Sequence, residues 1–205
     1  MDFDKEDRRT RYSKRVIREA LYELMKEKPI NKISVTEICK TADVNRSTFY
    51  AYYTDIYDLH QKILKEFFSI QKTVIKYIKE EIMTKNDIAE ITSADYYNIV
   101  RYYLETVEEN KELYKFVFNQ NANNSIHQSF GKVLYHTLKG VLNPLIEESR
   151  LEEFKKAFTF VSGGTTALIM QWVQKDCDTP IEDLAKHIAG YYFATFKAHN
   201  LEKRI

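Results

Sequence analysis

Glycine and proline are scarce in this sequence of 205 residues, which contains five glycines and three prolines. Folds made of β-strands need turn residues at short, regular intervals, and these two residue types supply many of them. Their scarcity, together with the lack of any long alternation of apolar and polar residues, argues against an all-β fold. The composition instead favours long helices connected by few tight turns.

Cysteine and long apolar runs are also nearly missing. The two cysteines, Cys39 and Cys177, lack the close spacing of a metal or redox motif, and so few cysteines argue against a disulfide framework. No apolar run approaches the roughly 18 residues of a membrane-spanning helix. The first residues, MDFDKEDRR, contain no apolar segment of the kind found in secretory leaders. We expect a cytoplasmic protein without a membrane partner.

Motifs for catalysis are not found either. The sequence contains no glycine-rich phosphate loop, nucleophile elbow or carboxylate array. Asp183 and His187 stand four residues apart and could bind a metal from one helix face, but no third ligand is near them in the sequence. We interpret them as a surface pair. The sequence thus predicts neither an enzyme nor a metal or cofactor site.

Positive charge, in contrast, is concentrated near the start of the chain. Residues 8–53 include eleven basic and five acidic residues, whereas residues 54–205 include 19 basic and 21 acidic ones. This excess indicates either a surface that meets a polyanion or a solvated basic face. The most N-terminal basic residues form either an arm that contacts DNA or a soluble tail. They are Arg8, Arg9, Arg11, Lys14 and Arg15.

Apolar residues recur at helical spacing along most of the chain. A first helix carries an apolar stripe from Val16 to Leu24 and stops near the segment KEKPIN, because Pro29 disfavours helix at the residue before it. Ser34 and Glu37 form a capping-box signature for a short second helix, and Asn45 offers an N-cap for a third that reaches about residue 50. Thr54 or Asp55 begins a long helix that continues to residue 82.

The remainder of the chain has the same helical character. We predict helices over about residues 96–109, 113–118, 126–143, 152–175 and 180–199, with a polar, asparagine-rich loop at residues 119–125. The predicted fold class is all-α, with about nine helices.

The segment SVTEICKTADVNRSTFY has the layout of a helix-turn-helix, in which two short helices meet at a tight turn. Ile38 and Val44 are expected to fill the angle between the helices, and Phe49 to anchor the second helix on the core. Tyr53 is also expected to pack inside. The residues then able to face outward are Asn45, Arg46, Ser47, Thr48, Tyr50 and Tyr52.

These residues carry a resemblance to a known family. The run Thr48-Phe49-Tyr50-Ala51-Tyr52-Tyr53 is followed by Asp55 and Leu59. From about residue 13 to residue 67 the sequence resembles the DNA-binding domain of the TetR family of transcriptional repressors. The later stretch SGGTTALIMQWV, with the proline-led helix after it, resembles the last two helices of that family. The resemblance implies a DNA-binding domain over residues 1–55 and a ligand-binding and dimerisation domain over residues 56–205.

The resemblance and the side-chain chemistry together predict the DNA contacts. Arginine can pair with guanine O6 and N7, and short hydroxyls and phenols are good donors to phosphate. Arg46 is the expected base contact. Ser47 either contacts a base or only completes the first helical turn, and Ser34 caps its helix and could also meet a phosphate. The predicted DNA-binding residues are Ser34, Asn45, Arg46, Ser47, Thr48, Tyr50, Tyr52 and Thr54.

Two positions depart from the family pattern. The family usually has glycine in the turn, where φ is positive, and this sequence has Asp43. The family also commonly has a lysine that grips a phosphate at the start of the fourth helix, where this sequence has Ile56. We expect Thr54 or the N-terminus of that helix to replace the missing contact.

The resemblance implies a pocket for a small-molecule effector among the middle helices. Pockets of this kind are mostly apolar with a few polar groups, and tyrosine supplies both. The body of the chain is rich in aromatic residues, from which we select a pool of candidate ligand contacts. The pool consists of Phe67, Tyr97, Tyr103, Phe118 and Tyr135.

The predicted dimer interface rests on two glycines inside the helix of residues 152–175. Glycine in a helix interior costs about 1 kcal/mol relative to alanine, so close approach of another helix is the simplest reason for it. The family dimerises through its last two helices as a four-helix bundle. We therefore predict an interface at Gly163, Gly164, Ala167 and Trp172, with a kink or a crossing within the chain as the alternatives.

Together these features predict a homodimeric transcriptional repressor that binds a palindromic double-stranded operator and is released by a small-molecule effector. One alternative is a regulator of the same fold that responds to a protein partner. A second alternative, from another class, is a helical protein that does not bind DNA.

Overall fold

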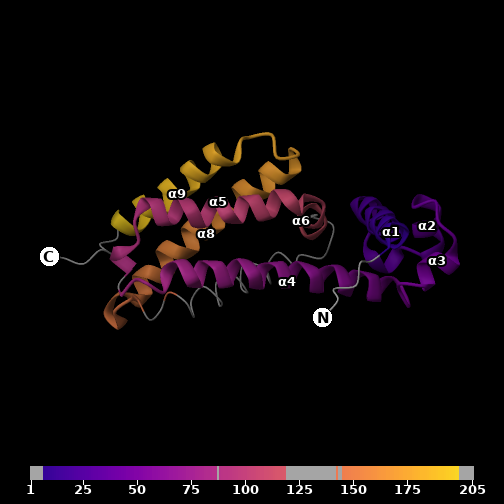
Figure 1. The fold of residues 1–205 in the computed structure, drawn as a ribbon, viewed down its shortest axis with the longest axis horizontal. Helices are drawn as coiled ribbons and strands as arrows, with labels where there is room; N and C mark the ends of the chain where they lie inside the picture. Colours follow the sequence, from indigo (N-terminus) through magenta and orange to yellow (C-terminus); the bar gives the residue numbers. More distant parts are fainter. Residues whose placement is uncertain (1–6, 87, 119–141, 143–144, 199–205) are drawn as a thin grey trace. The chain divides into compact units, whose positions relative to one another are not determined.

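The computed structural model describes residues 7–86, 88–118, 142 and 145–198. These residues form eight α-helices and no strand, which confirms the predicted all-α fold class (Figure 1). The helices are α1 (Arg8–Glu27), α2 (Val35–Thr41), α3 (Arg46–Tyr50), α4 (Ile56–Ile82), α5 (Ser93–Glu109), α6 (Lys111–Val117), α8 (Leu151–Gln174) and α9 (Ile181–Ala198). Three 3-10 turns join them: η1 (Ile30–Lys32), η2 (Ile88–Glu90) and η4 (Glu148–Arg150).

Two predicted elements lie wholly or mostly outside the described residues. They are the asparagine-rich loop of residues 119–125 and the helix of residues 126–143, in which only Leu142 is described and is helical. Within the described part of the chain, no helix is both long enough and apolar enough to cross a membrane.

The chain folds as two compact units. The first contains residues 1–68 and 116–126, and the second contains residues 69–115 and 127–205. Helix α4 begins in the first unit and ends in the second. The predicted division of function at residues 55 and 56 stays a prediction.

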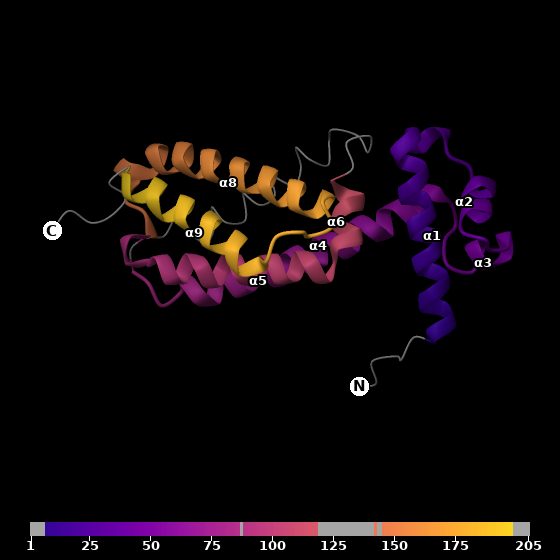
Figure 2. The ribbon, with the colours of Figure 1, turned by 90° about the horizontal axis from the view of Figure 1, so that it is seen from above.

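The first unit is built from α1, α2, α3 and the start of α4 (Figure 2). Helix α1 ends at Glu27, and Lys28 before Pro29 is extended, as expected for a residue that precedes proline. Side chains from all four helices form the core and are almost fully buried: Ile17, Leu21, Ile38, Phe49 and Leu59. This core fixes the short helices α2 and α3, which are too short to be stable alone.

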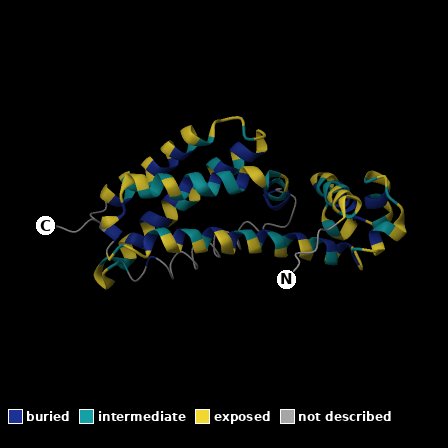
Figure 3. Cartoon of the chain, in the orientation of Figure 1, coloured by how far each residue is buried: buried dark blue, intermediate teal, exposed yellow. Residues whose placement is uncertain are grey.

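The second unit is a bundle in which α5 packs along α9 and α8 also packs on α9. Its core combines apolar residues from α4, α5, α8 and α9, and includes several aromatic rings. The rings of Phe154 and Phe196 stack with centroids 5.4 Å apart, and Phe154 also stacks on Phe158 at 5.7 Å. Buried and exposed residues recur along each helix as one side turns inward (Figure 3), which is the amphipathic pattern that the sequence predicts.

Candidate nucleic-acid interface

Helix α2 begins with the capping box that the sequence predicts. The Ser34 hydroxyl accepts a hydrogen bond from the backbone N–H of Glu37 at 3.2 Å, and the Glu37 carboxylate accepts one from the backbone N–H of Ser34 at 2.9 Å. Lys28 also pairs with this carboxylate. The hydrogen bond from Lys28, followed by those from Ser34, lowers the pKa of Glu37 to about 2. The start of the helix-turn-helix is therefore fixed by charge as well as by hydrogen bonds.

The turn between α2 and α3 uses the backbone conformation that glycine favours. Asp43 has a φ of 50°, as the family pattern implies for this position. Aspartate is among the few residues that adopt this region with modest strain. The backbone N–H of Val44 donates to the carbonyl of Cys39 at 3.0 Å and closes the turn.

Helix α3 begins at Arg46, with Asn45 in the N-cap position. Contrary to the predicted role of Asn45, its side chain makes no capping hydrogen bond. The amide is exposed instead. Phe49 anchors α3 from inside, where its ring meets Tyr50 edge-on at 5.5 Å and Tyr53 at 5.6 Å.

The polar residues around α3 divide by exposure much as the sequence predicts. Five of the predicted DNA-binding residues nearest to this helix are exposed, and two are half-buried. The exposed ones are Asn45, Arg46, Ser47, Tyr50 and Thr54, and the half-buried ones are Thr48 and Tyr52. Ser34, at the start of α2, is also exposed. Phe49 and Tyr53 are buried. The contact of the exposed groups with DNA stays a prediction.

Arg46 and Tyr50 form a pair that sequence reasoning did not predict. They stand one helical turn apart on α3, and Arg46 Nη2 donates to the Tyr50 hydroxyl at 3.3 Å. The guanidinium also lies 5.8 Å from the centroid of the Tyr50 ring. The pair holds an exposed guanidinium in one orientation, so less side-chain entropy remains to be lost when it binds a partner.

The start of α4 differs from our expectation that it would hold a phosphate. The backbone N–H of Asp58 donates to the Asp55 carboxylate at 2.8 Å, and that of Thr54 donates to the Asp58 carboxylate at 3.0 Å. Lys62 Nζ donates to Asp58 at 2.9 Å and to the carbonyl of Tyr52 at 2.9 Å. Ile56 is buried. Because two carboxylates already occupy this helix terminus, it is a poor site for an anion.

Two family profiles match the chain over parts that fit this geometry. Residues 17–63 match the profile of the bacterial regulatory proteins of the TetR family, which covers α1 to the start of α4. Residues 94–192 match a TetR-type C-terminal region of transcriptional regulators. The chain belongs to the TetR family of transcriptional regulators. The segment α2–turn–α3 is thus the helix-turn-helix of a TetR-family DNA-binding domain.

No curated protein matches the sequence. Among solved structures, the chain is similar to the dihydroxyacetone kinase operon activator DhaS, with 19% identity, a TM-score of 0.46, and coverage of 91% of this chain and 97% of that one.

The predicted effector contacts of this TetR-family regulator fall in different places. Phe67 and Phe118 are buried in the first unit. Tyr97 and Tyr103 are half-buried in the second unit, and Tyr135 lies outside the described residues. The structure therefore does not gather the pool within one unit.

A buried polar cluster in the second unit was missed by sequence reasoning. Gln71 is 3% exposed, and its Nε2 donates to the Tyr114 hydroxyl at 2.7 Å. Tyr103 lies beside Tyr114, with the ring centroids 6.4 Å apart. Burial raises the pKa of Tyr114 to about 12 and that of Tyr103 well above its usual value, so both phenols stay neutral. The only sequence signal was a glutamine on an otherwise apolar helix stripe.

The predicted dimer residues on α8 separate into an exposed set and a buried one. Gly163, Gly164 and Ala167 are exposed, and a Cβ added at either glycine would meet nothing within 4 Å. A crossing within the described chain therefore does not explain these glycines. Trp172 is 3% exposed, and its indole N–H donates to the carbonyl of Thr179 at 2.8 Å. Contrary to the prediction, Trp172 supports the connection between α8 and α9 within its own chain.

Proposed function

We propose that this TetR-family regulator binds a palindromic operator as a homodimer and represses transcription until a small-molecule effector releases it. The observation that carries the proposal is the exposed polar face of α3, which is held in place by the buried ring of Phe49. A helix-turn-helix places such a face in the major groove, where base edges can be recognised.

We assign base recognition to Arg46. Its guanidinium can donate to both O6 and N7 of a guanine, a contact worth roughly 1–3 kcal/mol of discrimination against other bases. The hydroxyls of Thr48, Tyr50 and Tyr52 are suited to donate to phosphates, which position the helix without selecting a sequence. Exposed Asn45, Ser47, Thr54 and Ser34 complete the proposed contact set.

The proposed dimer forms through α8 and α9. Each helix presents an exposed stripe of small residues beside an exposed aromatic ring. The stripe on α8 contains Phe160, Gly163, Gly164 and Ala167, and the stripe on α9 contains Gly190, Tyr191 and Ala194. Small residues allow helices of two protomers to approach closely, and the rings supply apolar area. A two-fold dimer would place its DNA-binding domains in major grooves about 34–36 Å apart.

The proposed effector acts through a difference in affinity. It must bind the form that cannot fit both half-sites more tightly than the form that can, because a ligand with equal affinity for both shifts nothing. A thermal-shift screen tests this part, since a ligand that binds the folded state raises its stability. If no small molecule stabilises the protein or weakens its DNA binding, regulation by a protein partner is favoured instead.

A selection from random duplexes tests DNA binding directly. We expect enrichment of a palindromic sequence at low salt, and loss of this enrichment for Arg46→Ala. Lys76→Ala is the matched control, because Lys76 is an exposed cation on the part of α4 that belongs to the second unit. The proposal fails if no sequence is enriched and if Arg46→Ala selects duplexes no differently from Lys76→Ala.

A further inference from the structure

The beginning of α1 carries an unusual concentration of positive charge. Arg8, Arg9 and Arg11 lie in its first turn or directly after it, and that turn contains no acidic residue. Cations at a helix N-terminus oppose the helix dipole and cost stability, whereas acids there would add to it. Asp7 at the N-cap offsets part of this positive charge, and a phosphate beside the helix would offset more.

The same part of α1 adjoins the proposed DNA-contact surface. Lys14 Nζ lies 5.5 Å from the centroid of the Tyr52 ring, directly after α3 in the chain. Arg11 precedes Lys14 by three residues and is exposed. Positions three apart are neighbours on a helix surface, so Arg11 extends the positive surface from Lys14 toward the start of the helix. In Figure 2 this end of α1 projects past α2 and α3.

The spacing of these residues suits a nucleic-acid strand. Arg8, Arg11 and Lys14 are separated by three residues each, which is about 4.5 Å along the helix axis. One strand of duplex DNA presents a phosphate about every 3.4 Å along its own axis. Neighbouring side chains of this set, each with a flexible stem, can therefore contact phosphates of one strand.

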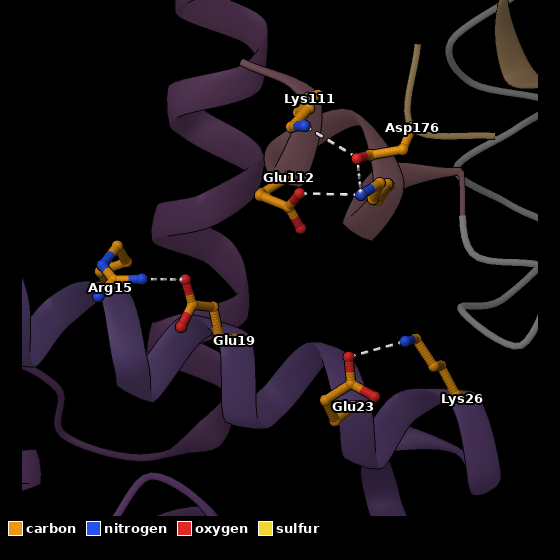
Figure 4. Close-up of polar contacts among 8 residues, drawn as sticks. Arg15, Glu19, Glu23, Lys26, Lys111, Glu112 and Asp176 are labelled. Atoms are coloured by element: carbon orange, nitrogen blue, oxygen red, sulfur yellow. Dashed lines mark hydrogen bonds and ion pairs between the residues drawn. The ribbon is translucent and has the colours of Figure 1, made fainter. Parts of the chain in front are cut away.

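Basic residues further along α1 form ion pairs with acidic residues of the same helix. Arg15 pairs with Glu19 at 2.8 Å, and Lys26 pairs with Glu23 at 2.7 Å (Figure 4). In contrast, Arg8, Arg9 and Arg11 form no ion pair with any described residue. Among the described residues of α1, the arginines without an ion pair to another described residue thus lie at the end that continues the proposed DNA-contact surface.

We infer that Arg11 and Lys14 of α1, with Arg8 beyond them, form a phosphate-binding surface that replaces the backbone N–H groups at the start of α4, which two carboxylates cap. The inference rests on the proposed DNA binding. At α4, Ile56 is buried and the cation Lys62 is engaged by Asp58 and the Tyr52 carbonyl. At α1, Lys14 lies beside Tyr52, itself a proposed phosphate contact, and Arg11 precedes Lys14 by three residues. Because phosphates carry no sequence information, this surface adds affinity and not specificity.

The test measures the affinity of the full-length protein for a selected operator and for a random duplex over a series of salt concentrations. The variants are Arg11→Gln, Lys14→Gln and the double change, with Lys14→Arg to restore the charge. Lys26→Gln is the matched control, since it removes one charge from the same helix about 18 Å away along the axis. Thermal unfolding of each variant checks that the domain stays folded.

We expect Lys14→Gln and Arg11→Gln each to weaken binding to both duplexes by a similar factor. Each change should also reduce the slope of log K against log salt by about 1 per half-site, with Lys14→Arg close to the unchanged protein. If both variants keep the slope of Lys26→Gln while Arg46→Ala still loses the operator, the inference is wrong and the proposed function stands. If the unchanged protein binds no duplex, both are overturned.

Discussion

At the scale of single residues, the aromatic residues of α3 and the segment after it divide into buried residues of the core and exposed residues that can contact DNA. Phe49 and Tyr53 are buried, whereas Tyr50 is 49% exposed and is engaged by Arg46. The sequence predicted this division, because the spacing of a helix settles which residues point inward. It did not predict the Arg46–Tyr50 pair, because a side-chain hydrogen bond depends on rotamers that spacing does not fix.

Asp43 offers a test of the turn at the same scale. A φ of 50°, as at Asp43, strains the backbone of a residue that has a side chain, whereas glycine adopts it without strain. We expect Asp43→Gly to raise the free energy of unfolding by about 0.5–1 kcal/mol, and Asp43→Val to lower it by about 1–2 kcal/mol, because a β-branched residue tolerates this region worst. Urea denaturation of both variants checks this. Equal stability of the two variants would show that the turn does not require a positive φ.

At the scale of elements, the helices whose ends carry local signals were predicted best. The capping box of α2, the end of α1 before Pro29 and the end of α4 at Ile82 all agree with the sequence analysis. The phosphate contact expected from Thr54 or the start of α4 stays a prediction. The network of Asp55, Asp58 and Lys62 at that helix terminus was not predicted, because it depends on side-chain rotamers that the sequence pattern does not fix. The capping-box pattern of residues 34–37 is therefore a firmer basis for predicting local structure than the residues at the start of α4.

The capping box predicts how stability depends on pH. The pKa of Glu37 falls from its usual value near 4.5 to about 2 in the folded protein. Its contribution is therefore complete above about pH 4.5 and is lost as the pH falls through about 2. We expect Glu37→Gln to be less stable than the unchanged protein near neutral pH, with the difference shrinking in acid.

Denaturant midpoints over a pH series measure this difference. Glu109→Gln is the control, because Glu109 is an exposed carboxylate at the end of α5. A gap between Glu37→Gln and the unchanged protein that stays constant from neutral pH to acid would contradict the role assigned to the capping box.

At the scale of the whole molecule, contacts between distant residues were beyond sequence reasoning. Gln71 and Tyr114 are 43 residues apart, and Lys111 and Lys115 on α6 both pair with Asp176 after α8 (Figure 4). No local sequence pattern predicts such pairs, since they form only when helices that are distant in the sequence pack together. The small residues on α8 could be predicted, because glycine inside a helix is itself a signal.

The exposed stripe on α8 predicts the effect of a large side chain on assembly. Because nothing within the described chain lies within 4 Å of a Cβ at Gly164, Gly164→Arg should leave the fold of the protomer intact. We expect this variant to sediment as a monomer while the unchanged protein sediments as a dimer. Asn98→Arg, at an exposed position on α5, is the control. A Gly164→Arg protein that remains a dimer would place the interface elsewhere.

The central claim is that α3 recognises DNA bases through Arg46, and one measurement tests it most directly. The affinities of the unchanged protein and of Arg46→Ala are determined for every single-base variant of the selected operator. The account predicts a loss of about 1–3 kcal/mol in Arg46→Ala, with base preference relaxed at one symmetric pair of positions and kept at the others. If Arg46→Ala keeps the same preference at every position, Arg46 does not recognise a base and the account is contradicted.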